Sequence, residues 1–217
     1  MQLRDLGYKD QYSRNMLQIN NNGEYFNETA ILNKVEATDW SWSPIFADFN
    51  NDGHQDLFIS NGIKKRPNDL DFKKYVSNTF KNHNEKDGLL WLFKSINEMP
   101  SGKAPNMIFK GNSKKFSNKN NQWIENKPTL SNGAIYSDLD LDGDLDCYIL
   151  NNSFKDPSKL ASFSKTRDIE DEFGGDRLMR NDNGVFTDVS QQAGIYRSAI
   201  GFGLGVSVSD VNGDFLP

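Results

Sequence analysis

Two stretches of the chain place oxygen-bearing side chains at alternate positions, a spacing that could serve a metal ion, catalytic acids or an acidic turn. The first is DFNNDGHQD, residues 48–56, and the second is DLDLDGDLD, residues 138–146. Counted from the first aspartate, side-chain oxygens fall at positions 1, 3, 5 and 9 of each loop. They belong to Asp48, Asn50, Asp52 and Asp56 in loop one, and to Asp138, Asp140, Asp142 and Asp146 in loop two.

An all-oxygen ligand set with several carboxylates suits a hard cation, and flexible coordination by about six to eight oxygens favours Ca²⁺ over Mg²⁺. Position 6 is Gly53 or Gly143, where a sharp turn favours a residue without a Cβ. The backbone carbonyl at position 7, of His54 or Asp144, is the expected fifth ligand. The carboxylate of Asp144 would then lie in water.

An EF-hand is excluded, because it requires glutamate at position 12 and flanking helices. Position 12 is Ile59 in loop one and Ile149 in loop two, and both lie in predicted strands. The aspartate at position 9 would replace that glutamate as the closing carboxylate.

Two other interpretations of the loops stay open on these residues alone. Carboxylates about 4 Å apart repel by roughly 4 kcal/mol at an effective dielectric constant near 20, which favours a bound cation. An Asx turn satisfied by backbone N–H groups is the plain structural alternative. Glycoside hydrolysis would need two differently tuned acids flanking a pocket, and no such pair stands out.

The loops belong to internal repeats. A third loop, DVNGDFLP, has Asp210, Asn212 and Asp214 at positions 1, 3 and 5, but Phe215 at position 6. Its position 9 falls beyond Pro217, so either the chain is cut from a longer one, which we expect, or this third site is broken. Upstream of each loop, a short apolar strand, a polar turn and an aromatic residue recur. From that aromatic residue (Phe26, Phe116, Phe186) to the first aspartate is 22, 22 and 24 residues.

Four short strands in each repeated unit are typical of a propeller blade, and propellers need about four to eight blades to close. The predicted fold class is therefore all-β, a partial β-propeller of about three four-stranded blades with a small helical insertion. We divide the chain into repeat 1 (1–62), a helical insertion (63–104), repeat 2 (105–152), a loop insertion (153–175) and a truncated repeat 3 (176–217).

The helical insertion shows apolar residues at helical spacing in two segments, 72–80 and 89–96. Gly88 should precede the second helix and Pro100 should end it. We expect a helical hairpin packed on the edge of a blade.

Composition bounds the function. The 217 residues are 36% hydrophobic with a net charge of −5, which argues against general nucleic-acid binding. Residues 64–119 hold 13 Lys and Arg against 5 Asp and Glu. We expect the basic residues to lie on solvated helix faces; as alternatives, the basic helical insertion could dock on the acidic propeller face or meet an anionic glycan. No apolar run approaches the ~20 residues of a transmembrane helix, and no signal sequence is visible.

Several single residues have plain structural explanations. The one cysteine, Cys147, excludes an intrachain disulfide and is expected to be a buried thiol. Trp40 and Trp42 share a strand face and suggest packing between blades, with carbohydrate stacking as the alternative. Trp91 and Trp123 are expected to be packing residues. The segment GFGLG at 201–205 leads into a predicted strand and not a helix, so a dinucleotide loop is not supported.

Three longer stretches around the loops resemble a known family: FADFNNDGHQDLFISNG, NGAIYSDLDLDGDLDCYILNN and GFGLGVSVSDVNGD. They resemble the FG-GAP/VCBS repeat, as in the integrin α-subunit propeller and in bacterial proteins similar to cartilage acidic protein. The resemblance implies a seven-bladed propeller on a secreted or surface protein, with Ca²⁺ in hairpin loops of the blades. It also implies a binding or scaffolding role without catalysis. The side chains named above, with the carbonyls of His54 and Asp144, would form the first two sites.

The expected function is a non-catalytic, Ca²⁺-binding propeller segment that presents a surface to a protein or glycan. The alternative is a module of a surface carbohydrate-processing enzyme or uptake complex. Extracellular Ca²⁺ modules bind at about 10⁻⁴–10⁻³ M, and such sites would stay empty in a cytosol. We therefore expect an extracellular, cell-surface or periplasmic location.

Overall fold

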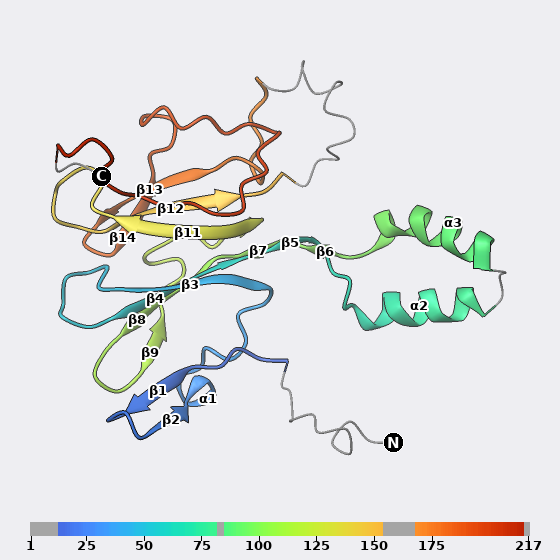
Figure 1. Ribbon diagram of the computed structural model, residues 1–217, viewed down its shortest axis with the longest axis horizontal. Coiled ribbons are helices and arrows are strands. Elements are labelled where there is room, and N and C mark those ends of the chain that lie inside the picture. Colours follow the sequence, from blue (N-terminus) through green and yellow to red (C-terminus); the bar gives the residue numbers. More distant parts are fainter. Residues whose placement is uncertain (1–12, 82–84, 154–167, 215–217) are drawn as a thin grey trace.

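Two four-stranded antiparallel sheets dominate the computed structural model, which describes residues 13–81, 85–153 and 168–214 (Figure 1). The first sheet has the order β3-β4-β8-β9 and the second has the order β11-β12-β13-β14. The strands of the first sheet are Ser41–Ala47, Asp56–Asn61, Met107–Gly111 and Phe116–Asn118. Those of the second sheet are Ser131–Ser137, Asp146–Asn151, Arg177–Asp182 and Val185–Asp188. The chain is therefore predominantly β, as expected.

The sheets are offset by two strands from the repeat units of the sequence. Each sheet takes an Asp-loop hairpin (β3-β4 or β11-β12) and completes itself with the strand-turn-strand segment that follows (β8-β9 or β13-β14). The first such segment, β1 (Gln18–Asn21) with β2 (Tyr25–Glu28), stands as a two-stranded sheet. The described residues thus hold two four-stranded sheets and not three, because residues 201–214 contribute only an isolated bridge between Phe202 and Asn152.

The main core lies between the two sheets. Phe49 in loop one and Phe58 in β4 are almost fully buried. They belong to one cluster with Cys147, Ile149 and Phe186 of the second sheet. Phe49 meets Phe186 edge-on, with ring centroids 5.4 Å apart. Cys147 is a free buried thiol, as expected, and burial raises its pKa to about 12.

A second core covers the opposite face of the first sheet. Here the segment around the short helix α1 (Ala30–Asn33) packs Ala30 and Val35 against Leu57, Ile59 and Phe109. Residues of β4 alternate between the two cores, so all six of them are buried. Strand β4 therefore runs through the interior and leads directly out of loop one.

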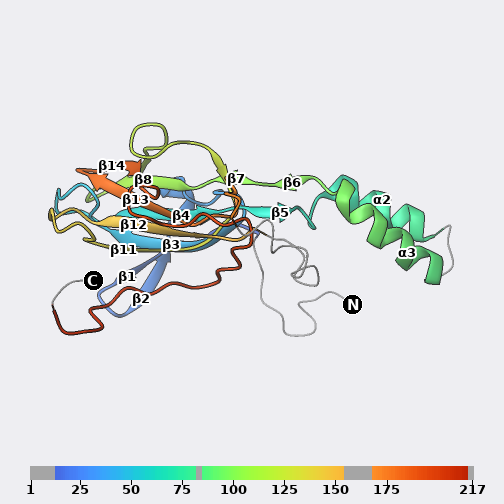
Figure 2. The ribbon, with the colours of Figure 1, turned by 90° about the horizontal axis from the view of Figure 1, so that it is seen from above.

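The helical insertion stands away from the sheets (Figures 1 and 2). Strands β5 (Ile63–Lys65) and β6 (Ser101–Gly102) form a stalk that carries α2 (Leu70–Phe80), α3 (Glu85–Ser95) and the 3₁₀ turn η2 (Ile96–Glu98). The expectation of a hairpin packed on a blade edge is wrong, because α2 and α3 contact each other through aromatic side chains and not the sheets, and Leu70 and Phe93 stay about 70% exposed. Trp91, a packing residue as expected, meets Tyr75 and Phe80 at centroid distances of 5.0 and 6.3 Å.

Gly88 lies inside α3 and does not precede it. A Cβ at this position would come within 2.9 Å of the Phe80 ring, so the glycine permits close approach of the two helices. Two short strands, β7 (Ala104–Pro105) and β10 (Pro128–Thr129), then pair between the insertion and the second sheet.

Trp40 and Trp42 do not join the core between the sheets, and only Trp42 lies within β3. Trp42 is 45% exposed, and its indole N–H donates to the carbonyl of Gly62 at 2.8 Å. Trp123 does pack on that core. Of the loop insertion 153–175, residues 154–167 lie outside the described part, and residues 168–175 form neither a helix nor a strand. No helix among the described residues is long and apolar enough to cross a membrane.

Candidate metal centre

Each Asp-rich loop is the turn of a hairpin between two paired strands. Loop one joins β3 to β4, and loop two joins β11 to β12. Position 4 has a left-handed backbone in all three loops, at Asn51 (φ 53°), Leu141 (φ 65°) and Gly213 (φ 78°). Position 6 is also left-handed in the first two, at Gly53 (φ 84°) and Gly143 (φ 95°). The predicted glycine requirement at position 6 is thus confirmed for both.

The position-9 aspartates anchor the loops to their sheets. Asp56 is fully buried and accepts hydrogen bonds from the backbone N–H groups of Phe49 (3.0 Å) and Gly111 (2.8 Å). Asp146 is 2% exposed and accepts from Leu139 (3.0 Å) and Asn181 (2.9 Å) in the same arrangement. Burial raises the pKa of both carboxyls.

Loop two gathers carboxylates as a cation site would. One oxygen from each of Asp138, Asp140 and Asp146 lies within 4.8 Å of the other two. Oδ1 of Asp138 is buried and has no hydrogen-bond partner among the described residues, while its Oδ2 accepts from Gly143 at 3.1 Å. A buried carboxylate oxygen without a donor is costly, and a bound cation would satisfy it. The residues of loop two therefore fit Ca²⁺.

Loop one is similar but carries a competing cation. Oδ1 of Asn50 is buried and unpartnered within the described residues, as a ligand atom would be. However, Lys110 Nζ lies 2.6 Å from Asp52 Oδ2. This hydrogen bond is the main reason that the pKa of Asp52 is lowered, with a second contribution from Asn50. In the second sheet the matching residue, Arg180, pairs with Asp182 at 3.0 Å instead.

Backbone N–H groups also bind the loop carboxylates, so part of the turn interpretation holds. Asp48 accepts from Asp52 (3.0 Å) and Gly53 (2.7 Å). Asp142 accepts from Asp144 at 2.9 Å. A carboxylate oxygen has a second lone pair, so these bonds leave room for a metal ligand.

Asp144 departs from expectation. Its carboxylate was expected in water, but the residue is only 8% exposed. Oδ2 accepts from the backbone of Asn183 at 2.7 Å, and Oδ1 accepts from the Asn51 side chain at 2.6 Å. The carboxylate thus ties loop two to loop one and to the β13-β14 turn. Its backbone carbonyl, like that of the exposed His54, stays a predicted ligand.

Loop three lies open at the surface in its described part. Gly213 N donates to Asp210 Oδ1 at 2.7 Å, and Asp214 N donates to Asn212 Oδ1 at 3.1 Å. Phe215 and the residues after it lie outside the described part of the chain.

A recurring asparagine escaped the sequence interpretation. Asn61 and Asn151 stand at the ends of β4 and β12, and both are almost fully buried. Their side-chain amides donate to the carbonyls of Pro105 (2.9 Å) and Gly175 (2.6 Å), just before β8 and β13. The signal was available, because asparagine occupies position 14 from the first aspartate in both loops.

Comparison with known proteins supports the resemblance for the first repeat, which contains loop one. No curated protein matches the chain. Residues 5–59 match the family model of the FG-GAP-like repeat, a range that includes β1 to β3, all of loop one and most of β4. The chain therefore carries an FG-GAP-like repeat.

Proposed function

We propose that loops one and two bind Ca²⁺, and that the chain is a β-propeller segment of a secreted or cell-surface protein. In this proposal it is a non-catalytic scaffold for a protein or glycan. The observation that carries the proposal is the oxygen cluster of loop two, with its unpartnered Asp138 Oδ1. Three carboxylates so close repel one another, and the attraction of each to a divalent cation bound between them outweighs that repulsion.

Loop two is the stronger of the two proposed sites. Among the described residues no lysine pairs with its carboxylates and Arg180 pairs with Asp182, whereas Lys110 Nζ already pairs with Asp52 in loop one. For Ca²⁺ to bind loop one, that ammonium has to leave the carboxylate. We therefore expect loop two to fill at lower Ca²⁺ concentration.

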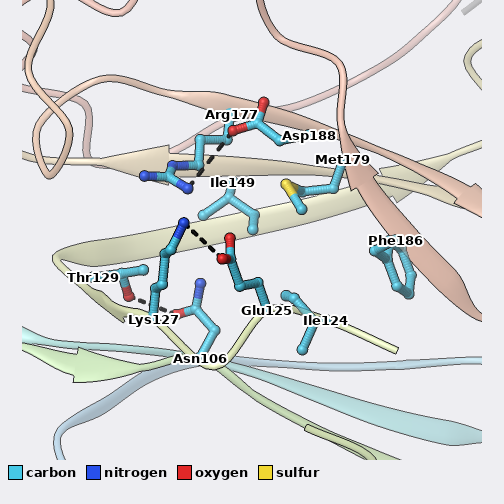
Figure 3. A pocket seen from close by; sticks show the side chains of 10 residues that line it. All are labelled: Asn106, Ile124, Glu125, Lys127, Thr129, Ile149, Arg177, Met179, Phe186 and Asp188. Atoms are coloured by element: carbon cyan, nitrogen blue, oxygen red, sulfur yellow. Dashed lines mark hydrogen bonds and ion pairs between the residues drawn. The ribbon is translucent and has the colours of Figure 1, made fainter. Parts of the chain in front are cut away.

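The catalytic alternative gains no support from the inner cavity shown in Figure 3. The two acids that line it, Glu125 and Asp188, are both ion-paired, to Lys127 and to Arg177. A glycosidase would need one acid with a raised pKa and a second acid across from it. A scaffold role does not need such a pair.

Thermal melting with and without Ca²⁺ tests the metal proposal. A ligand that binds only the native state stabilises it by about 2.7 kcal/mol at 100 times its Kd. Wild type should melt higher in Ca²⁺ than in the same concentration of Mg²⁺. Asp140→Ala should lose most of this gain, because Asp140 offers a ligand oxygen and accepts only one long hydrogen bond, from Asp142 N at 3.3 Å.

Glu24→Ala is the control. It removes an exposed carboxylate in the turn between β1 and β2, outside the Asp-rich loops and the ligand cluster. Its Ca²⁺ response should equal that of wild type. An equal Ca²⁺ gain in Asp140→Ala and wild type would rule out loop two as the site.

A further inference from the structure

A small cavity separates the link between β9 and β10 from one face of the second sheet (Figure 3). Its volume is about 80 Å³. Ile149 and Phe186 give it apolar walls, and the charged groups of Glu125, Lys127, Arg177 and Asp188 also line it. A wider hollow of about 350 Å³ shares these four charged residues and adds Arg197.

Three cations and three acids line the wider hollow, but the two arginines among them are poorly matched by acceptors. Lys127 Nζ is already matched by Glu125 Oε1 at 2.6 Å. Arg177 and Arg197 are left to share one carboxylate, because each has an Nη1 atom 3.6 Å from the same oxygen, Asp188 Oδ2. The other oxygen of Asp188 accepts from the backbone and hydroxyl of Ser190, at 3.1 and 2.5 Å. Glu172 also lines the wider hollow, where it is exposed.

The two guanidinium groups also lack hydrogen-bond acceptors. A guanidinium has five N–H donors. Within the described residues, the Nε atoms of both arginines are buried without a partner. Arg177 Nη2 does donate to the carbonyl of Glu172 at 2.8 Å, and the 3.6 Å contacts with Asp188 are too long for good hydrogen bonds. Buried donors are rarely left unpaired in native proteins, so a missing acceptor is indicated.

The pKa of Arg177 agrees with this geometry. Burial is the main cause that lowers this pKa and the nearby charge of Arg197 lowers it further, while Asp188, Glu172 and Glu125 raise it only in part. Two like charges held close together in a partly buried place favour a compensating anion between them.

We propose that this cavity binds a carboxylate group of a ligand, held between Arg177 and Arg197. The planar fork of arginine matches two carboxylate oxygens, which no single point charge does. A water molecule occupies about 30 Å³ of liquid, so the inner space suits a group of carboxylate size. The rest of the ligand would lie in the wider hollow, where Gln191 and Gln192 offer hydrogen bonds. This site is separate from the Asp-rich loops and does not depend on bound metal.

The arginine Nε–H resonances report on the site directly in ¹⁵N NMR of the whole chain. Sodium acetate should shift the Arg177 and Arg197 signals with saturation, and sodium chloride at equal ionic strength should not. Acetamide, which has the same shape without the charge, should also leave them in place. A response to acetate no greater than that to chloride would overturn the proposal.

Variants on and off the site sharpen the test. Arg197→Gln should weaken acetate affinity at least tenfold. Arg180→Gln lies on the same strand but pairs with Asp182, and should leave the affinity unchanged. Asp188→Asn removes the competing carboxylate and should tighten acetate binding. If Arg197→Gln does not fold, Asp188→Asn decides, because unchanged or weaker binding there would contradict the proposal.

Two further comparisons test which kind of molecule carries the carboxylate and whether its binding depends on metal. Glucuronate compared with glucose tests a carboxylate carried on a sugar, and tighter binding of glucuronate than of acetate would indicate that the wider hollow contributes. Equal affinities would indicate a site for small free carboxylates. Metal is removed by dialysis and not by a chelator, because chelators are themselves carboxylates. Acetate should bind equally with and without Ca²⁺, so the anion site can stand even if the metal proposal fails.

Discussion

At the scale of single residues, Asp144 shows how one carboxylate can hold two loops together. Its two oxygens accept from Asn51 in loop one and from Asn183 in the β13-β14 turn. Asp144→Ala removes both bonds, and Asn51 keeps only its 3.4 Å hydrogen bond to the carbonyl of Gly143. We expect a loss of about 1–3 kcal/mol in the free energy of unfolding, measured by urea denaturation in saturating Ca²⁺.

The same variant separates side-chain and backbone roles at position 7. Alanine keeps the carbonyl, so the Ca²⁺-induced rise in melting temperature should persist. Asp182→Ala, an exposed acid in the neighbouring turn, should cost less. Equal stabilities of Asp144→Ala and wild type would mean that the carboxylate lies in water after all.

Leu141 marks a strained position in loop two. It is 59% exposed, and its φ of 65° is unfavourable for a residue with a branched side chain. Loops one and three carry Asn51 and Gly213 here, which tolerate this conformation. Leu141→Asn should therefore stabilise the protein by about 1 kcal/mol.

A chemical denaturation series with a matched control checks this gain. Val211 is also an exposed aliphatic residue in an Asp-rich loop, but its φ is not left-handed. Val211→Asn should leave the stability unchanged. A similar effect of both substitutions would mean that replacing an exposed apolar side chain, and not relieving the backbone at position 4, causes the gain.

At the scale of elements, an ion pair at the β1-β2 hairpin introduces a pH dependence. Arg14 Nη2 lies 2.7 Å from Glu28 Oε2, and Glu28 Oε1 accepts from Ala30 N at 2.8 Å. The hydrogen bond with Arg14, followed by that from Ala30, lowers the pKa of Glu28 from 4.5 to about 2. A carboxyl with a lowered folded-state pKa stabilises the fold fully above about pH 4.5, and this contribution is lost as the pH falls towards 2.

Arg14→Met should raise the pKa of Glu28 and shift this loss of stability in acid to higher pH. Melting temperatures would be measured between pH 3 and 7 and compared with the value of each protein at pH 7. As the pH falls, the variant should lose stability at a higher pH than wild type. Lys119→Met, which removes an exposed charge near Gln122, is the control for general charge effects. Identical pH profiles for wild type and Arg14→Met would contradict the assignment.

The sequence predicted the hairpin elements better than their assembly. Alternating oxygens, a glycine at position 6 and flanking apolar runs located loops one and two, because these are local properties of the chain. Which strand pairs with β4 is not local: β8 lies beyond a 42-residue insertion, 63–104, and joins the sheet through the position-9 Asp56 and Gly111 N. The repeat unit was therefore visible while its offset from the sheets was not.

The site was predicted in outline for the same reason. Spacing identified the ligand oxygens, but Lys110 on Asp52 and Asn51 on Asp144 are contacts between distant segments. The cavity arginines carried no sequence pattern, since Arg177 and Arg197 meet only through the fold. Helical spacing located α2 and α3, but it did not show that they face each other and stand away from the sheets.

At the scale of the whole molecule, the two sheets are joined by polar as well as apolar contacts. Asn181 is fully buried, and its amide donates to the carbonyls of Phe49 in loop one (2.7 Å) and Leu145 in loop two (3.1 Å). Its Oδ1 accepts from Gly184 N at 2.8 Å. One side chain therefore serves three backbone groups on both sides of the core.

Asn181→Ala should lower the free energy of unfolding by at least about 2 kcal/mol, because it leaves buried backbone groups unpaired. Hydrogen exchange should show amides of β3 and β4 losing protection together with those of β12 and β13. Asn151→Ala is the contrasting variant, because the Asn151 amide donates to the carbonyl of Gly175 next to the second sheet. Its loss of hydrogen-exchange protection should begin in the second sheet. If Asn181→Ala loosens only the second sheet, the sheets unfold independently, and the interface contributes little cooperativity.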